Sequence, residues 1–241
     1  MERKRKVEGN YIRRPEKYRH EFKYLCSEAQ LVMLAARLKG IMRPDSHTGA
    51  DGRYMVKSLY FDDEDDRCFV ENEDGTGPRE KYRIRIYDNK ADRISLECKR
   101  KESDKVMKKS CLLTQEQFRV LACGTGAGDM EGMPGLARRL LTLKKSSGMK
   151  PKVIVSYERT PYVYKNGNVR VTFDRNIASS SNVKDFFAEH GGRRLILPSG
   201  QQLLEVKYDE YLPDHIYRAL SLANMQRITF SKYYLCRRYH L

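Results

Sequence analysis

The sequence predicts an α+β protein whose antiparallel β-sheet is ionic on one face and covered by helices on the other. Three observations support this fold class. Short segments in which apolar and polar residues alternate recur from residue 19 onward. The polar face of most of these segments is charged and mainly basic. Segments with the helical period lie between them, and their apolar faces need an apolar surface to cover.

Strands are expected wherever the period of two is clear. The expected strands are residues 19–25, 55–62, 80–88, 93–100, 107–113, 152–164, 169–176, 203–208 and 228–237. Asn166 and Gly167 lie between two of these segments and are typical of a tight turn. Residues 152–176 are therefore expected to form one β-hairpin.

Four segments are expected to be helical. The clearest is residues 27–40, where Ser27 and Gln30 form a capping box and Gly40 ends the helix. Its apolar face consists of Leu31, Leu34, Ala35 and Leu38. Thr114 and Gln117 suggest a second capping box, and the two remaining helices are residues 135–145 and 213–225. Residues 72–78 and 124–135 are glycine-rich and are expected to be loops.

The composition is that of one folded and highly charged domain. The chain has 241 residues, of which 40% are hydrophobic and 33% are charged, so it can bury a core and is too apolar to be disordered. Residues 1–15 are expected to be a flexible basic arm and residues 16–241 the folded domain. Lysine and arginine number 47 and aspartate and glutamate 32, a net charge of +15. Such an excess attracts anionic partners.

The six cysteines predict a reduced, cytoplasmic protein, because they form no C-x-x-C pair and have no nearby histidines at zinc spacing. The start of the chain is polar and basic, unlike a signal peptide. No run approaches the ~20 apolar residues that a membrane-spanning helix needs. No integral membrane segment is expected.

The charged residues of each strand fall on one face. In residues 80–88, for example, Lys81, Arg83 and Arg85 alternate with apolar residues. The same pattern holds for Arg19, Glu21 and Lys23, for Glu97 and Lys99, for Arg170, Thr172 and Asp174, and for Glu205 and Lys207. One such strand is explained by a face exposed to water. Their repetition favours an inside-out barrel whose charged faces look into a common bore, with an open sheet as the alternative.

Converging cations need an anionic ligand. Two unit charges ~4 Å apart interact by about 4 kcal/mol at an effective dielectric of 20, so uncompensated cations oppose folding. A linear chain of phosphates is compact, flexible and highly charged, as such a bore requires. No nucleic acid is expected, because duplexes favour convex basic surfaces or groove-reading helices and single strands add stacking aromatics. Most of the 16 tyrosines fall on apolar strand faces or at strand ends instead.

A series of short motifs carries a family resemblance. They are Arg19-x-Glu21-x-Lys23-Tyr24, residues 58–62 (SLYFD), Lys81-x-Arg83-x-Arg85-x-Tyr87, Glu97-x-Lys99, Tyr157-x-Arg159-x-x-Tyr162, Arg170-x-Thr172-x-Asp174, residues 204–207 (LEVK) and Ser231-Lys232-Tyr233. In this order, over about residues 18–239, the chain resembles the polyphosphate polymerase domain of the vacuolar transporter chaperone (VTC) complex. That domain belongs to the triphosphate tunnel metalloenzymes, with the CYTH phosphatases and RNA triphosphatases.

The resemblance implies a closed, eight-stranded antiparallel β-barrel, the triphosphate tunnel, with helices packed on its outside. It implies that basic side chains grip triphosphate or polyphosphate and that glutamates hold Mn²⁺ or Mg²⁺. The phosphate-binding candidates are Lys23, Arg83, Arg85, Lys99, Lys108, Arg159, Arg170, Lys207 and Lys232. All of them except Lys108 and Lys207 are also expected to be catalytic. Glu205 is the expected metal ligand, with Glu21 and Glu97 behind it, and only one of Lys108 and Lys109 can face the tunnel.

The expected activity is metal-dependent phosphoryl transfer, with synthesis of polyphosphate from ATP as the leading hypothesis. The transition state of phosphoryl transfer is loose, so the protein mainly aligns groups and neutralises charge and needs no catalytic triad. Carboxylate oxygens suit magnesium or manganese. A triphosphatase of the same fold and a non-catalytic polyphosphate-binding module are the alternatives.

Overall fold

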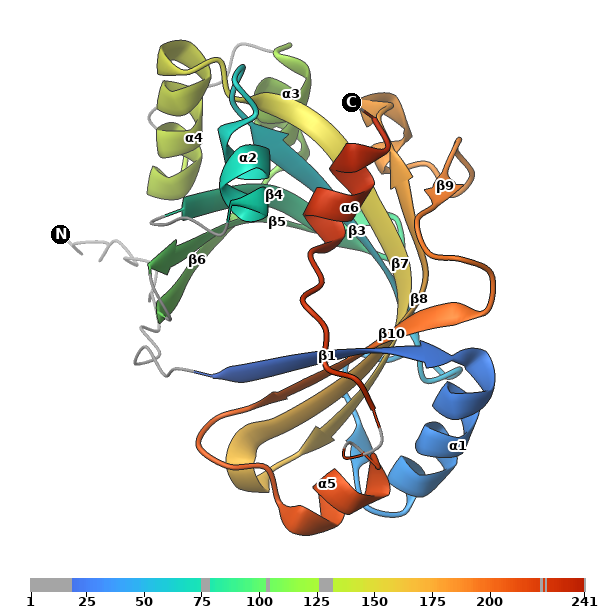
Figure 1. The fold of residues 1–241 in the computed structure, drawn as a ribbon. Coiled ribbons are helices and arrows are strands. Elements are labelled where there is room, and N and C mark those ends of the chain that lie inside the picture. Colours follow the sequence, from blue (N-terminus) through green and yellow to red (C-terminus); the bar gives the residue numbers. More distant parts are fainter. Residues whose placement is uncertain are drawn as a thin grey trace, which may run out of the picture.

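A single antiparallel β-sheet forms the centre of the computed structural model, which describes residues 19–74, 79–102, 105–125, 132–221, 223 and 225–240. The strand order is β1-β10-β8-β7-β3-β4-β5-β6. In sequence order, their bounds are β1 (His20–Ser27), β3 (Tyr54–Asp62), β4 (Arg79–Tyr87), β5 (Lys90–Glu102), β6 (Lys105–Leu113), β7 (Lys150–Tyr164), β8 (Val169–Ser180) and β10 (Gln201–Tyr208). Figure 1 shows that the sheet is strongly curved, with β1 and β6 in opposite wings.

Most of the predicted strands are confirmed, including the hairpin of β7 and β8. Its turn is the short 3₁₀ segment Asn166–Asn168, in which Gly167 has a φ of 72°, a conformation that glycine adopts readily. Two short strands were not predicted: β2 (Arg43–Pro44) pairs with β7, and β9 (Arg194–Leu195) pairs with β8. The basic arm predicted for residues 1–15 lies outside the described residues.

The helices lie on both faces of the sheet (Figure 1). Their bounds are α1 (Glu28–Lys39), α2 (Arg67–Glu73), α3 (Gln115–Cys123), α4 (Gly135–Ser146), α5 (Asp214–Ala219) and α6 (Lys232–Arg238). Both predicted capping boxes are present, at Ser27 and Gln30 and at Thr114 and Gln117. The helix predicted for residues 213–225 is shorter than expected, and α2 was not predicted. No helix in the described ranges is both long and apolar enough to span a membrane.

The outer, convex face of the sheet is apolar, as the alternation predicts. Leu31, Leu34 and Leu38 of α1 pack with α5 against residues of β8 and β10. Helices α3 and α4 pack over β4 and β5, where Tyr82, Ile84 and Ile86 join their cluster. The residues that alternate with these apolar side chains therefore point to the concave face.

The predicted closed barrel is not confirmed. In the described part of the chain the path of paired strands ends at β1 on one side and β6 on the other, and no pairing joins them. The free edge of β1 meets the C-terminal segment instead: Ile228 N donates to Lys23 O at 2.9 Å, and Tyr24 forms a bridge with Arg227. This segment therefore occupies backbone groups at the free edge of β1. The sheet is open and curved, and the C-terminal segment crosses its open side (Figure 1).

The strand predicted for residues 228–237 is wrong. Lys232–Arg238 forms helix α6, and the side chain of Ser231 caps it by accepting a hydrogen bond from Tyr234 N. The buried residues of α6 are Tyr233, Cys236 and Arg237, three and four residues apart, which is the helical spacing. The tyrosine-rich sequence resembles a strand because aromatic residues are common in strands.

Helix α6 covers one end of the concave face, so that face is not ionic throughout. Tyr233 and Cys236 of α6 pack with Val153 and Val155 of β7 in an apolar cluster. The hydroxyl of Tyr233 donates to the buried carboxylate of Asp62, which also accepts from backbone N–H groups at the start of α2. At this end of the concave face an apolar cluster lies beside Asp62, and the rest of that face forms the charged region.

Candidate active site

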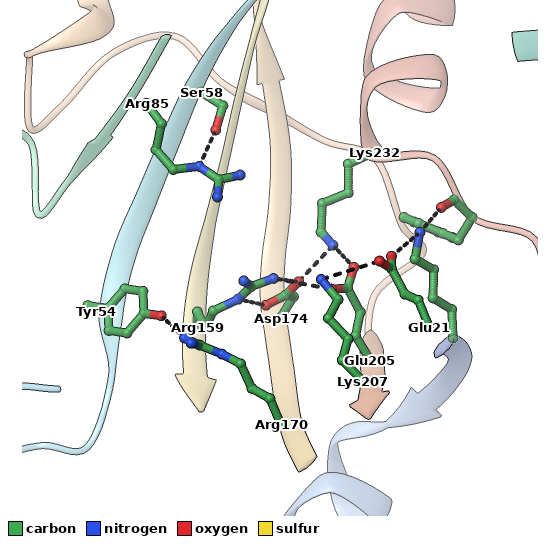
Figure 2. Close-up of polar contacts among 12 residues, drawn as sticks. Glu21, Tyr54, Ser58, Arg85, Arg159, Arg170, Asp174, Glu205, Lys207 and Lys232 are labelled. Atoms are coloured by element: carbon green, nitrogen blue, oxygen red, sulfur yellow. Dashed lines mark hydrogen bonds and ion pairs between the residues drawn. The ribbon is translucent and has the colours of Figure 1, made fainter. Parts of the chain in front are cut away.

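Two buried carboxylates form the centre of the charged region. Arg159 Nε and Nη2 donate to the two oxygens of Asp174 at 2.6 and 2.7 Å. Lys232 Nζ lies 2.7 Å from Asp174 Oδ2 and 2.6 Å from Glu205 Oε1. Figure 2 shows these side chains converging from β7, β8, β10 and α6. Asp174 and Glu205 are 0% and 4% exposed. Because a buried carboxylate without a partner is costly, the ion pairs with Arg159 and Lys232 are needed to keep both carboxylates ionised.

The neighbouring charges hold these groups ionised. Burial by itself raises the pKa of Glu205, but Lys232, Lys207 and Arg159 hold it well below its usual range. Burial likewise raises the pKa of Asp174, and Arg159 and Lys232 lower it. The pKa of Lys232 is lowered by burial and raised by Asp174 and Glu205, with a net increase. Two carboxylates and two cations thus neutralise each other at this centre.

A chain of ion pairs continues from this centre to β1. Lys207 Nζ lies 3.3 Å from Glu205 Oε2 and 3.5 Å from Glu21 Oε2. Lys23 Nζ lies 3.0 Å from Glu21 Oε1 and donates to Phe230 O at 2.7 Å. Glu21 and Lys23 therefore connect the charged centre to the C-terminal segment that crosses the open side of the sheet.

A second group surrounds Glu97 in the other wing. Arg83 Nε and Nη2 lie 2.7 and 2.6 Å from Glu97 Oε2, and Lys108 Nζ lies 2.6 Å from Glu97 Oε1. Arg85 is held differently, since its Nε donates to Ser58 Oγ at 3.1 Å and its Nη1 is 3.9 Å from Glu97. Burial raises the pKa of Glu97, but Arg83, Arg85 and Lys108 together lower it by more. The net effect is a pKa well below the usual range.

Lys108, and not Lys109, lies on the concave side. Lys108 contacts Glu97, whereas Lys109 is the partner of Cys98, whose side chain belongs to the apolar cluster under α3 and α4. Lys99 lies between the two charged groups. Burial lowers its pKa, Glu21 raises it, and Lys207, Lys23 and Arg83 lower it, so the electrostatic influence of β1 and β10 reaches the opposite wing.

Arg170 lies apart from both groups, at the start of β8 next to the turn of the hairpin. Its Nη2 is 2.9 Å from Asp45 Oδ2 and donates to Tyr54 Oη at 3.0 Å. Asp45 is itself fixed by the backbone N–H of His47, which donates to Asp45 Oδ1 at 3.0 Å. The guanidinium of Arg170 is therefore held by two groups from outside its own strand, of which Figure 2 shows Tyr54.

The predicted metal ligands do not form one cluster. Glu97 contacts Arg83, Arg85 and Lys108, whereas Glu205 contacts Arg159, Lys207 and Lys232. Within the described ranges, no three His, Cys, Asp or Glu side chains are grouped closely enough to hold a metal ion. Glu205 and Asp174 do approach a common cation, Lys232 Nζ, and both offer the oxygen atoms that Mg²⁺ and Mn²⁺ prefer. This pair fits a divalent cation better than Glu97 does.

Sequence reasoning missed several residues of the site. Asp174 was placed on the ionic face but given no role, although its position two residues after Thr172 in the alternating motif marks it as inward. Tyr60, which accepts from Arg83 Nη1 at 2.9 Å, and Tyr54, which accepts from Arg170 Nη2 at 3.0 Å, were given no role in the site, because most tyrosines were expected on apolar strand faces or at strand ends. No pattern in the sequence indicates that Asp45 reaches Arg170.

The comparison with protein families identifies the chain. The VTC domain matches residues 18–240. This chain belongs to the VTC domain family. No protein with a curated description matches it.

Three solved structures are similar to this VTC domain at low identity. A Bacillus halodurans protein with a provisional adenylate cyclase name is 15% identical, covers 89% of this chain and 93% of its own, and has a TM-score of 0.48. The PH1819 protein of Pyrococcus horikoshii is 13% identical, with coverages of 87% and 92% and a TM-score of 0.43. The Mimivirus capping enzyme triphosphatase is 11% identical, with coverages of 88% and 89% and a TM-score of 0.37. These values are too low to carry over an activity.

The ion pairs make the stability of the VTC domain depend on pH. Burial by itself raises the pKa of Glu21, but Lys207 and Lys23 lower it from 4.5 to about 2. A carboxyl whose pKa is lowered on folding stabilises the fold above its unfolded pKa, and this contribution is lost as the pH falls through the folded pKa. Glu21 should therefore stabilise the domain at about pH 7 and lose its effect between about pH 4.5 and pH 2.

Thermal unfolding midpoints of the wild type and Glu21→Gln over this pH range measure the effect. The midpoint of Glu21→Gln should lie below that of the wild type at about pH 7, and the two should converge at the acidic end. Glu116→Gln is the control, because the Glu116 side chain is 53% exposed and pairs with Arg119 on the surface. A difference between Glu21→Gln and the wild type that stays constant from neutral to acidic pH would contradict the assignment.

Proposed function

We propose that this VTC domain is a metal-dependent phosphoryl-transfer enzyme that acts on triphosphate or polyphosphate, and that it synthesises polyphosphate from ATP. The observation that supports this most strongly is the excess of cations on the concave face. Lysines and arginines from β1, β4, β5, β6, β7, β8, β10 and α6 outnumber the carboxylates there. These cations are Lys23, Lys81, Arg83, Arg85, Lys99, Lys108, Arg159, Arg170, Lys207 and Lys232, and the carboxylates are Glu21, Asp45, Asp62, Glu97, Asp174 and Glu205.

The arginines are suited to bind and orient phosphate groups. Each guanidinium has several donors in a planar fork, which matches phosphate oxygens well. Arg83 and Arg85 lie on one strand, two residues apart, so their side chains are on the same face. Together with Lys99 they would hold a chain of phosphates in a fixed position and neutralise charge that develops during transfer.

The centre around Asp174 and Glu205 is suited to the reacting phosphate. Lys232 and Arg159 contact both carboxylates, so each cation can exchange a carboxylate oxygen for a phosphate oxygen without being left unpaired. Glu205, with Asp174, would hold the divalent metal ion, which supplies neutralisation of the phosphate oxygens when it is bound. The predicted roles of Glu21 and Glu97 are better described as orienting Lys23 and Arg83.

Polymerase and hydrolase activities differ only in the group that accepts the phosphoryl. A polyphosphate end as acceptor extends the chain, whereas water as acceptor releases phosphate. Membership of the VTC family supports the polymerase.

Incubation of the purified protein with ATP and Mn²⁺ tests this function. Long polyphosphate chains on a gel are expected, and phosphate release without chains would contradict the polymerase in favour of a triphosphatase. Absence of any turnover would favour a binding module without catalysis. Glu205→Gln should be inactive, whereas Lys109→Met should match the wild type, because Lys109 lies on the convex side next to the site residue Lys108.

A further inference from the structure

Three lysines form a row across the wing opposite β1. In the register of the sheet, Lys81 of β4 is the partner of Lys99 of β5, and Lys99 is the partner of Lys108 of β6. All three lie on the concave face, because Lys81 and Lys99 are two residues from Arg83 and Glu97 and Lys108 contacts Glu97. Like charges directly opposite each other destabilise a sheet. This lysine row therefore needs a counter-charge.

The protein supplies little of this counter-charge. Lys108 pairs with Glu97 at 2.6 Å. Within the described residues, Lys81 and Lys99 have no carboxylate within ion-pair distance. Lys81 Nζ is 3.4 Å from the side-chain oxygen of Asn72 and 4.7 Å from the centre of the Tyr233 ring. Neither ammonium group is therefore neutralised by a direct ion pair, although Glu21 acts on Lys99 from a greater distance.

The row contrasts with the centre at Asp174 and Glu205. There, Arg159 and Lys232 are neutralised by buried carboxylates. Burial lowers the pKa of both Lys81 and Lys99. Arg79 and Arg83 also lower that of Lys81, and Lys207, Lys23 and Arg83 lower that of Lys99 against an increase from Glu21. The lysine row would therefore stabilise a bound anion more than the centre at Asp174 and Glu205 would, because the cations of that centre are already neutralised.

We propose that Lys81, Lys99 and Lys108 form a separate phosphate subsite that binds the part of a linear polyphosphate beyond its first few phosphates. This inference rests on the proposed function and adds a residue, Lys81, to which the family resemblance gives no phosphate-binding role. Lys81 is two residues from Arg83 along β4, which is a distance of about 7 Å at a rise of ~3.4 Å per residue. The row runs across the sheet from β4 to β6, and β6 is the last strand in the described strand order.

Affinities for two anions test the subsite. Inorganic triphosphate and a much longer linear polyphosphate are titrated into the wild type, Lys81→Met, Lys81→Arg and Lys109→Met by calorimetry at one salt concentration. Lys81→Met should lose about tenfold in affinity for the long chain and less than about twofold for triphosphate, as expected for one lost charge-assisted contact. Lys81→Arg should retain most of the affinity. Lys109→Met should match the wild type, because Lys109 lies on the other face.

Stability distinguishes a binding role from a structural one. Lys81→Met removes an ammonium without a carboxylate partner, so its unfolding midpoint without ligand should equal or exceed that of the wild type. Lys81→Gln serves as the second variant if Lys81→Met does not fold, since its amide can still donate to Asn72. The same loss of affinity for both anions in these variants, or no loss for either, would overturn the subsite.

Two further outcomes separate this inference from the proposed function. If the wild type binds triphosphate and Lys81→Met binds the long chain as tightly as the wild type does, only the subsite is wrong. If the wild type binds neither anion, the proposed function is wrong as well. Single-stranded RNA is titrated as a comparison, and a loss at Lys81→Met seen with RNA but not with polyphosphate would overturn the proposal.

Discussion

Replacement of Asp174 by alanine should lower the free energy of unfolding by about 3–5 kcal/mol, the cost of removing one partner from a buried ion pair. Asp174 is fully buried and accepts two hydrogen bonds from Arg159, at 2.6 and 2.7 Å. Its removal leaves Arg159 with only the longer contact to Glu205, at 3.4 Å, and Lys232 with one carboxylate. Denaturant unfolding measures the loss.

The control for this variant is an ion pair on the surface. Glu116→Ala breaks the contact with Arg119 at 3.1 Å, in which both side chains are more than half exposed. Such pairs contribute at most about 1 kcal/mol. If Asp174→Ala were no more destabilising than Glu116→Ala, the buried ion network could not have the importance assigned to it.

Replacement of Arg85 by alanine should weaken binding of triphosphate by about 10-fold to 100-fold, the usual range for a lost hydrogen bond to a charged group. Arg85 has a weaker carboxylate contact than Arg83, because it lies 3.9 Å from Glu97, whereas Arg83 has two contacts with Glu97 below 2.8 Å. Its side chain is 10% exposed, so water competes little for its donors. Calorimetric titration with inorganic triphosphate measures the effect.

Two variants calibrate the result for Arg85. Arg85→Lys keeps the charge but loses the planar fork, so its affinity should lie between those of the wild type and Arg85→Ala. Arg119→Ala removes an exposed arginine of α3 and should bind triphosphate as the wild type does. Wild-type affinity in Arg85→Ala would exclude this arginine from the phosphate site.

The alternation of residues was sufficient to predict most strands and the face on which each side chain lies. This succeeded because the side chains of a strand point alternately to opposite faces, whatever the strand pairs with. The capping boxes at Ser27 and Thr114 were equally local signals. Helix α6 was predicted as a strand because its tyrosines favour strands, while its cap at Ser231 and the helical spacing of its buried residues went unrecognised.

Closure of the sheet could not be predicted from alternation. Whether β1 pairs with β6 depends on which backbone groups reach its edge, and Ile228, about 200 residues away in the sequence, reaches it here. The same limit applies to the site. Alternation placed Glu21, Glu97 and Glu205 on one face but gave no distances between strands. It therefore could not show that Glu97 and Glu205 contact different cations.

Charge balance was also hidden from the sequence. Lys99 and Lys207 occupy similar positions in alternating motifs, yet among the described residues Lys207 has two carboxylates within 3.5 Å and Lys99 has none within ion-pair distance. Only the register of β4, β5 and β6 reveals the lysine row. The phosphate-binding roles implied by the family resemblance stay predictions until a ligand is seen.

A crystal structure of this VTC domain with inorganic triphosphate tests most directly whether the concave face binds phosphate chains. The anion should lie on that face, with its oxygens within hydrogen-bond distance of Arg85 and Arg83. Triphosphate bound on the convex side of the sheet, with Arg85 and Arg83 free of any contact to it, would contradict the proposed site and the activity inferred from it.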